Sequence, residues 1–331
     1  MKFKVLSYRE EQQLNTVERH TYYEMLREYA ISRKLTNTTP GATTVAPKLK
    51  GITGIICNNV CKFLAGGDCE IVVDGVENIQ EDAVLFASTH QGLLDGFVWI
   101  PDCPKHSLIF HGIVKNTMLL LAQINTGLIL VTKERGNHVH RLNAKLDAIS
   151  VLLNGHSVFI CPEVTWNLSP NKLHLPCNFW FVDIAQKANR PIVPVVMEYT
   201  YDTTSKKERI TRIHIRYGES IWVSEQDKLM DKLEEYKEKI STIRWELIEE
   251  KGLFSRRNIS NMEYVNFIKG NLNNLKMGQI DINREREGIQ GSNEEFYKFH
   301  HINDVPFNEN GELLETEEVR RLKKINRNHG I

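Results

Sequence analysis

Two side chains that follow an apolar run, His90 and Asp95, are of the types that could do acid–base chemistry. A carboxylate bonded to one imidazole nitrogen fixes the tautomer of the ring, so the other nitrogen can remove a proton from a hydroxyl. Residues five apart on an ideal helix lie about 140° apart around its axis and do not face each other. The two side chains therefore meet only if His90 lies in a loop and Asp95 in the first turn of a following helix. Spacing alone favours a plainer alternative, a structural histidine and a helix-start aspartate.

The segment before this pair must be a strand that delivers it to the edge of a sheet. Residues 83–89 form a continuous apolar run, which is typical of a strand buried on both faces. Strand termini are a usual place for function in α/β sheets. Gly92 and Gly96 give the backbone after the strand the freedom to turn.

Strand-like and helix-like stretches alternate along the chain, which indicates an α/β fold. We predict a mixed, mainly parallel central sheet flanked by helices, with an N-terminal helical pair and a C-terminal helical extension. The expected strands are 69–79, 83–89, 107–110, 127–131, 157–161, 191–197 and 212–218. The expected helices are 9–33, 50–64, 138–153, 178–189 and 224–250.

The same pattern divides the chain into four regions. Residues 1–66 form an N-terminal helical segment, with a loop at 36–47, and residues 67–222 form the α/β domain. Residues 223–254 form an amphipathic helix packed on that domain, and Ser224 with Asp227 resembles a capping box at its start. Residues 255–331 form a polar extension.

Composition narrows the function classes. The chain has 331 residues, and its 42 Lys and Arg balance 42 Asp and Glu, so we expect no nucleic-acid partner. The six cysteines include no C-x-x-C pair, which favours reduced thiols and gives no zinc site at familiar spacing.

The sequence also predicts that no segment crosses a membrane. The longest uncharged run, between Lys115 and Lys133, contains polar residues and a Thr-Gly break. The N-terminal residues lack the apolar stretch of a signal peptide. We expect a cytoplasmic protein, with binding at a membrane face left open and its oligomeric state undetermined.

Sequence blocks on either side of His90 and Asp95 favour the catalytic interpretation of the pair over the structural one. Four ordered blocks together resemble the glycerol-phosphate and lysophospholipid acyltransferase family, over about residues 69–222. They are His90-Gln-Gly-Leu-Leu-Asp95, Gly127-Leu-Ile-Leu-Val-Thr-Lys133, Pro162-Glu-Val-Thr-Trp166 and Pro191-Ile-Val-Pro194.

The resemblance implies a glycerolphosphate-acyltransferase-like fold and transfer of a fatty acyl group to a hydroxyl of a glycerolipid, lysophospholipid or related acceptor. The donor would be a thioester of coenzyme A or acyl-carrier protein, with no other cofactor, no metal and no covalent acyl-enzyme. His90 would be the general base and Asp95 its orienting partner. Backbone N–H groups near Gly92 or Gly127 could stabilise the tetrahedral oxyanion.

The family's acceptor-binding blocks are altered in this chain. The second-block Arg is Lys133, with Arg135 two residues on, and Val164 and Trp166 replace the third-block Gly and Arg. Arg grips phosphate through a bidentate fork, which Lys replaces only in part and Trp not at all. Either Lys133, Arg135 and Lys172 bind phosphate in another way, or the acceptor lacks a terminal phosphomonoester.

The other third-block positions complete the predicted acceptor site. Glu163 and Thr165 stand at family positions that would help to hold the acceptor. Trp166 could stack on a sugar, line an acyl path or serve packing. Two alternatives to a transferase remain: a non-catalytic lipid-binding protein with the same fold, and an acyl-thioesterase that uses water as acceptor.

Overall fold

The strands form one sheet, which is the frame of the molecule. The computed structural model describes residues 3–38, 59, 69–79, 83–91, 95, 106–111, 128–131, 138–163, 167, 173–175, 177–202 and 209–251. Within these residues the sheet has seven strands. Their bounds are β1 (Glu70–Asp74), β2 (Leu85–Ser88), β3 (His106–His111), β4 (Leu128–Val131), β5 (Ser157–Ile160), β6 (Ile192–Asp202) and β7 (Arg209–Tyr217).

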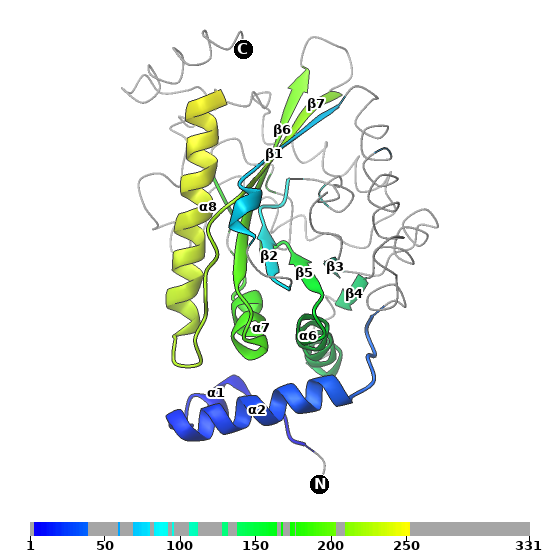
Figure 1. Cartoon of the computed structure of the whole chain (residues 1–331), viewed down its shortest axis with the longest axis vertical. Coiled ribbons are helices and arrows are strands. Elements are labelled where there is room, and N and C mark those ends of the chain that lie inside the picture. Colours follow the sequence, from blue (N-terminus) through cyan, green and yellow to red (C-terminus); the bar gives the residue numbers. More distant parts are fainter. Residues whose placement is uncertain are drawn as a thin grey trace, which may run out of the picture.

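The order of the strands across the sheet is β1-β7-β6-β2-β5-β3-β4. β6, β2, β5, β3 and β4 run parallel to one another, and the antiparallel β6–β7 pairing reverses β7 together with β1. This topology, visible in Figure 1, confirms the predicted mixed, mainly parallel sheet. The carboxyl ends of β6, β2 and β5, three adjacent strands, therefore lie at the same edge.

Both faces of the central strands are buried, which explains their continuous apolar runs. Leu85 and Ala87 of β2 belong to one apolar cluster, which also contains residues of α6, α7 and α8. Val84 and Phe86 belong to a second cluster, on the face shared with β7. Because successive side chains of a strand point to opposite faces, a strand between two cores has no polar alternation to display.

The described helices follow the predicted ranges closely. Asn15 divides the predicted 9–33 helix, because its side chain accepts the N–H groups of Val17 and Glu18, each at 3.0 Å, and so caps a new helix. The bounds are α1 (Tyr8–Glu11), α2 (Thr16–Ser32), α6 (His138–Leu153), α7 (Trp180–Ala188) and α8 (Leu229–Lys251), with the short 3-10 turn η1 (Val76–Asn78) after β1.

The predicted start of α8 at residue 224 is wrong. The helix begins at Leu229. Ser224 N–H donates to Asp227 Oδ2 at 2.7 Å, and Asp227 N–H donates to the Ser224 carbonyl at 3.1 Å, which closes a turn before the helix. The same residue pairing serves a turn as readily as a cap, so the sequence pattern did not distinguish them.

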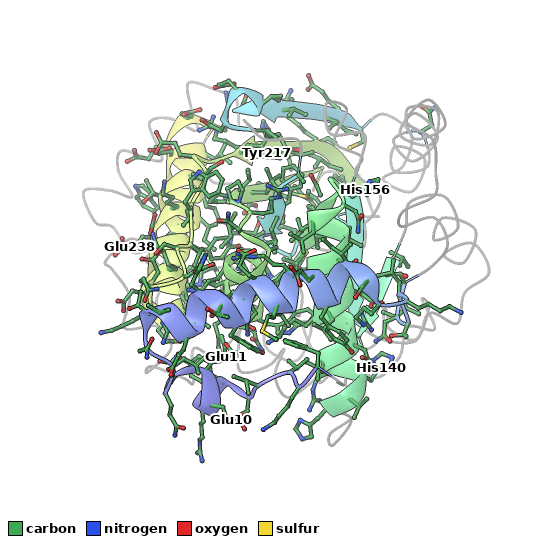
Figure 2. All side chains as sticks on the ribbon, turned by 60° about the horizontal axis from the view of Figure 1, so that its bottom comes forward. Glu10, Glu11, His140, His156, Tyr217 and Glu238 are labelled. Atoms are coloured by element: carbon green, nitrogen blue, oxygen red, sulfur yellow. The ribbon has the colours of Figure 1, made fainter. Side chains whose placement is uncertain are left out.

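A buried ion cluster attaches the N-terminal helices to the sheet domain. Lys187 Nζ lies 2.7 Å from Glu11 Oε1 and 2.8 Å from Asp183 Oδ1, and Lys145 also contacts Asp183. Although burial opposes it, the two lysines lower the pKa of Asp183 to about 2. Figure 2 shows α2 lying across this face of the molecule, with Glu11 labelled. Removal of one charge would leave its partners uncompensated, which typically costs about 3–5 kcal/mol.

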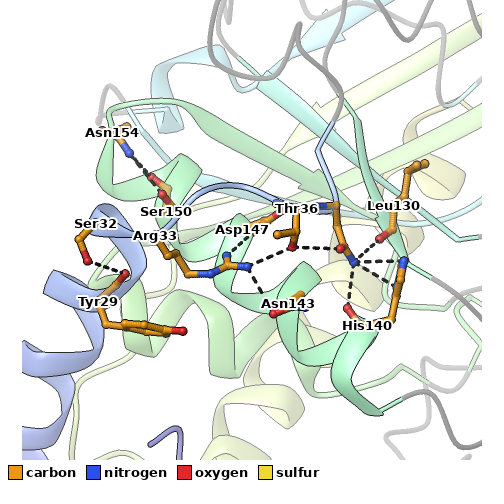
Figure 3. Close-up of polar contacts among 11 residues, drawn as sticks. Tyr29, Ser32, Arg33, Thr36, Leu130, His140, Asn143, Asp147, Ser150 and Asn154 are labelled. Atoms are coloured by element: carbon orange, nitrogen blue, oxygen red, sulfur yellow. Dashed lines mark hydrogen bonds and ion pairs between the residues drawn. The ribbon is translucent and has the colours of Figure 1, made fainter. Parts of the chain in front are cut away.

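A second polar network joins the segment after α2 to the edge of the sheet (Figure 3). Arg33 contacts Asp147 of α6, and Asn37 N–H donates to the same carboxylate at 2.7 Å. Leu130 N–H of β4 donates to the Asn37 carbonyl at 2.7 Å. The Asn37 amide donates in turn to the carbonyls of Leu130, at 3.2 Å, and His140, at 2.9 Å. The N-terminal segment thus covers the edge strand and is an integral part of the fold.

Several predicted segments lie in parts of the chain that the structure does not describe. The helix predicted at 50–64, apart from residue 59, most of the loop predicted at 36–47, and the extension at 255–331 lie outside the described residues. The four-region division remains a prediction. Within the described residues, no helix is both long and apolar enough to cross a membrane.

Candidate active site

His90 and Asp95 follow β2, and their side chains meet. His90 Nδ1 lies 2.8 Å from Asp95 Oδ2. The His90 side chain is 23% exposed and that of Asp95 is 1% exposed. The imidazole therefore reaches solvent at one edge while it rests on a buried carboxylate at the other. The two side chains therefore meet, while residues 92–94 and 96–100, which include the expected helix, lie outside the described part of the chain.

The carboxylate of Asp95 accepts hydrogen bonds at both of its oxygens. Oδ2 accepts the Gln91 N–H at 2.6 Å in addition to His90 Nδ1. Oδ1 accepts the hydroxyl of Tyr199, which comes from β6. A buried carboxylate needs such partners to replace water. Because the donors approach both oxygens, they also fix the plane of the carboxylate that faces the imidazole.

The backbone of His90 is held from both sides by the segment after β5. Its N–H donates to Glu163 Oε2 at 2.7 Å, and its carbonyl accepts the N–H of Asn167. The other Glu163 oxygen, Oε1, accepts the N–H of Leu175 at 2.7 Å. One buried carboxylate therefore ties the His90 loop to the segment around Leu175.

The electrostatic environment of Glu163 is unusual for a glutamate. Burial raises its pKa to about 7, against the lowering effect of the N–H groups of Leu175 and His90 and of the charge on Arg244. The nearby charge of Asp95 raises this pKa further. The proton equilibrium of the residue that anchors His90 thus falls close to neutral pH.

Arg244 of α8 contacts two of the segments that surround His90 and Glu163. Its Nε contacts Glu198 of β6, and its Nη1 donates to the carbonyl of Leu173. Residues 173–175 are consequently held at Leu173 by Arg244 and at Leu175 by Glu163. The side chains of Arg244 and Glu198 are 7% and 2% exposed, so the two form a buried ion pair.

Most of the residues that form this site lie within a stretch that matches a known protein family. Residues 70–198 match the family model described as Acyltransferase, a range that contains His90, Asp95 and Glu163. Residues 70–198 are a domain of the acyltransferase family. The resemblance read from the sequence extended to residue 222, whereas the match ends at Glu198.

The chain is similar to the crystal structure of the 1-acyl-sn-glycerophosphate (LPA) acyltransferase PlsC from Thermotoga maritima, with 17% sequence identity and a TM-score of 0.42. That similarity covers 73% of this chain and 85% of the other. The comparison with curated proteins gave no match.

Most of the predicted acceptor-binding residues of the acyltransferase domain lie outside the described part of the chain. These residues, together with the two glycines of the predicted oxyanion site, are Lys133, Arg135, Thr165, Trp166, Gly92 and Gly127. The ends of the segment that carries Lys133 and Arg135 are nevertheless described. The Asn37 amide bonds the carbonyls of Leu130 and His140 and so fixes both flanks of residues 132–137.

The N–H groups next to the imidazole have partners of their own. The His90 N–H donates to Glu163 and the Gln91 N–H donates to Asp95. These two N–H groups are therefore not available to an oxyanion, and the donors were expected near Gly92 or Gly127, outside the described residues. That expectation stays a prediction.

A thiol also lies near the pair. Cys161 follows β5, and burial raises its pKa well above the usual range, an effect that the charges of Asp95 and Glu163 reinforce. The thiolate is the nucleophilic form of cysteine. Cys161 is therefore poorly suited to form an acyl-enzyme.

A group of possible metal ligands lies on α2 and near the start of α8. His20, Glu24 and Glu225 bring one ligand atom each within 4.8 Å of one another. Arg27 pairs with both carboxylates, at 2.5 Å for Glu24 and 2.8 Å for Glu225. These ion pairs account for the cluster, and the expectation that the reaction needs no metal stays a prediction.

Sequence reasoning missed the residues that support the pair from other strands and helices. Tyr199, Glu198, Arg244 and Asn167 all belong to this layer, and none lies within a few residues of His90 along the chain. A charged residue, Glu198, directly after an apolar run was the one available signal. Its meaning depends on the pairing of β6 with β2, which the sequence does not display.

Glu163 should make stability depend on pH. Its folded pKa of about 7 exceeds the ordinary 4.5, so between these values the folded state holds a proton that the unfolded state has lost. The free energy of unfolding should therefore fall as pH rises through this window, by about 3 kcal/mol in total from this group. The Glu163→Gln variant should lose that slope in denaturant titrations performed from pH 4.5 to pH 7.5.

A matched surface change controls for the loss of one charge. The Glu219 side chain is 83% exposed, so Glu219→Gln should leave the pH dependence of the unfolding free energy as in the wild type. Equal slopes for the wild type and Glu163→Gln would contradict a raised pKa of Glu163 in the folded state.

Proposed function

We propose that the protein transfers a fatty acyl group from an acyl-coenzyme A or acyl-carrier-protein thioester to a hydroxyl of a glycerolipid, lysophospholipid or related acceptor. The observation that carries the proposal is the contact between His90 Nδ1 and Asp95 Oδ2, 2.8 Å long, at the carboxyl end of a central strand in an acyltransferase-family domain. A partly exposed imidazole backed by a buried carboxylate is suited to general-base catalysis.

In the proposed reaction, Nε2 of His90 removes the proton of the acceptor hydroxyl as its oxygen attacks the thioester carbonyl. The new C–O bond gives a tetrahedral oxyanion, and collapse of this intermediate breaks the C–S bond. The leaving thiolate takes the proton from the imidazolium, so the products are an ester and a free thiol. The charge of Asp95 stabilises the imidazolium between the two proton transfers.

Glu163 contributes to this reaction by positioning, in our proposal. Its two oxygens accept the N–H groups of His90 and Leu175 and so set the backbone on which the imidazole stands. The family resemblance gave Glu163 a part in holding the acceptor. The bonds to backbone N–H groups support a role in holding the protein itself.

The altered acceptor blocks predict a preference among acceptors. Because Trp166 and Lys133 stand where the family has Arg, we expect weak transfer to lysophosphatidic acid and faster transfer to a non-phosphorylated or sugar-bearing acceptor. The measurement is ester formation by the purified full chain with each acceptor, at equal donor concentration. A clear preference for lysophosphatidic acid would end the idea of a changed acceptor site.

Thiol release in the same assay separates the three function classes. A transferase releases one thiol for each ester formed, and only when an acceptor is present. Thiol release that is equal with and without acceptor would indicate a thioesterase. No thiol release across several acyl lengths and acceptors would favour the lipid-binding alternative. That alternative is suggested by Val164 and Trp166, which replace the family's Gly and Arg.

The expected surroundings of the reaction also remain predictions. These are a cytoplasmic location, with peripheral binding at a membrane face left open, and an acyl donor and a hydroxyl acceptor as partners, with no nucleic acid.

A further inference from the structure

We propose that Tyr199 is a positioning residue for acyl transfer and acts through Asp95, an inference that rests on the proposed function. Its hydroxyl donates to Asp95 Oδ1, the oxygen opposite the one that meets His90. The family match ends at Glu198, so Tyr199 lies one residue beyond the matched range. It does not touch the imidazole, and its effect must pass through the carboxylate.

The sheet places this hydroxyl with little freedom. Tyr199 pairs with Ile213 across the antiparallel β6–β7 ladder, and its side chain is among the largest fully buried ones. Its ring packs in the apolar cluster that also contains Phe86 of β2. The preceding residue of β6, Glu198, contacts Arg244 of α8. Both Glu198 and Tyr199 are therefore fixed in place by side-chain contacts. A rigid donor at the end of a fixed ring is suited to orienting a carboxylate.

The chemical consequence concerns the plane and the charge of Asp95. A donor on Oδ1 restrains rotation of the carboxylate, and this keeps Oδ2 directed at His90 Nδ1. The same hydrogen bond takes up part of the negative charge of the carboxylate, so less of that charge acts on the imidazole. Without the hydroxyl, the pair should be both less well aligned and more basic.

The test is Tyr199→Phe, which keeps the ring and removes the hydroxyl. We expect kcat to fall about tenfold, the scale of one lost hydrogen bond in the transition state, with KM for donor and acceptor unchanged. We also expect the acidic limb of the pH profile of kcat/KM to move up by about half a pH unit. Circular dichroism should show the wild-type fold.

The matched control is Tyr23→Phe. Tyr23 is also a buried tyrosine, and its hydroxyl donates to Gln186 Oε1 at 3.0 Å. This variant loses a buried hydrogen bond on α2, so it should retain the wild-type kcat and pH profile. A fall in kcat shared by both variants would assign the effect to general stability and overturn the proposal.

A second readout does not depend on turnover. The imidazole N–H that bonds to Asp95 should give a downfield proton resonance, identified by its absence in His90→Ala. Tyr199→Phe should shift this resonance and Tyr23→Phe should not. If the wild type transfers acyl groups but Tyr199→Phe leaves kcat, pH profile and resonance unchanged, the role of Tyr199 is refuted and the proposed function stands. If the wild type transfers no acyl group, the proposed function fails, and an unshifted resonance would still refute the positioning of the pair by Tyr199.

Discussion

His90→Ala should lower kcat/KM for acyl transfer by about a thousandfold or more, because general-base catalysis contributes on that scale. The fold should survive the change. The contacts that hold this loop through Glu163 and Asn167 use the backbone of residue 90, which alanine keeps. Asp95 would still accept the Gln91 N–H and the Tyr199 hydroxyl. The measurements are steady-state kinetics and thermal unfolding of the same preparations.

The surface offers a matched histidine for this experiment. His20 Nδ1 lies 2.9 Å from Glu225 Oε2, and the His20 side chain is 63% exposed. His20→Ala therefore removes a similar histidine–carboxylate pair away from β2 and should leave kcat/KM unchanged. Turnover by His90→Ala within tenfold of the wild type would refute the assignment of His90 as the base.

Asp95→Asn should lower kcat/KM by about a hundredfold, the lower end of what general-base catalysis contributes and less than the loss of the imidazole itself. The asparagine oxygen can still accept from His90 Nδ1 and the Gln91 N–H, and its amide can donate to the Tyr199 oxygen. The geometry is thus largely kept, whereas the charge that stabilises the imidazolium is lost. The comparison is made in kcat/KM, the same quantity as for His90→Ala.

Two outcomes would contradict this account of Asp95. Wild-type turnover by Asp95→Asn would show that its charge is not used. A loss greater than that of His90→Ala would show that Asp95 has another part in the reaction, for which the present geometry gives no basis.

The parts of the fold that could be predicted are those written locally in the chain. The run at 83–89 showed a strand buried on both faces, and the structure gives β2 there, between two apolar clusters. His90 and Asp95 were found because they follow that strand within five residues. Their contact joins residues only five apart in the chain, so it did not depend on which strands become neighbours.

The rest of the site depends on which strands become neighbours. Tyr199 reaches Asp95 because β6 pairs with β2, with Ser88 opposite Val195. Arg244 enters the same layer because α8 packs beside β6. Apolar runs specify that strands are buried but carry no record of their order, so these contacts were not available from the sequence. The start of α8 was misjudged for a related reason, since a turn and a cap share the same residue types.

The central claim is that His90 and Asp95 act as one unit, and a double-mutant cycle on kcat/KM tests it most directly. The variants are His90→Ala, Asp95→Asn and the combination of both, measured with one acyl thioester and one acceptor. If Asp95 acts only through the imidazole, the double variant should be no slower than His90→Ala alone. Losses that multiply, so that the double variant is about a hundredfold slower than His90→Ala, would show that the two residues act independently and would contradict the account.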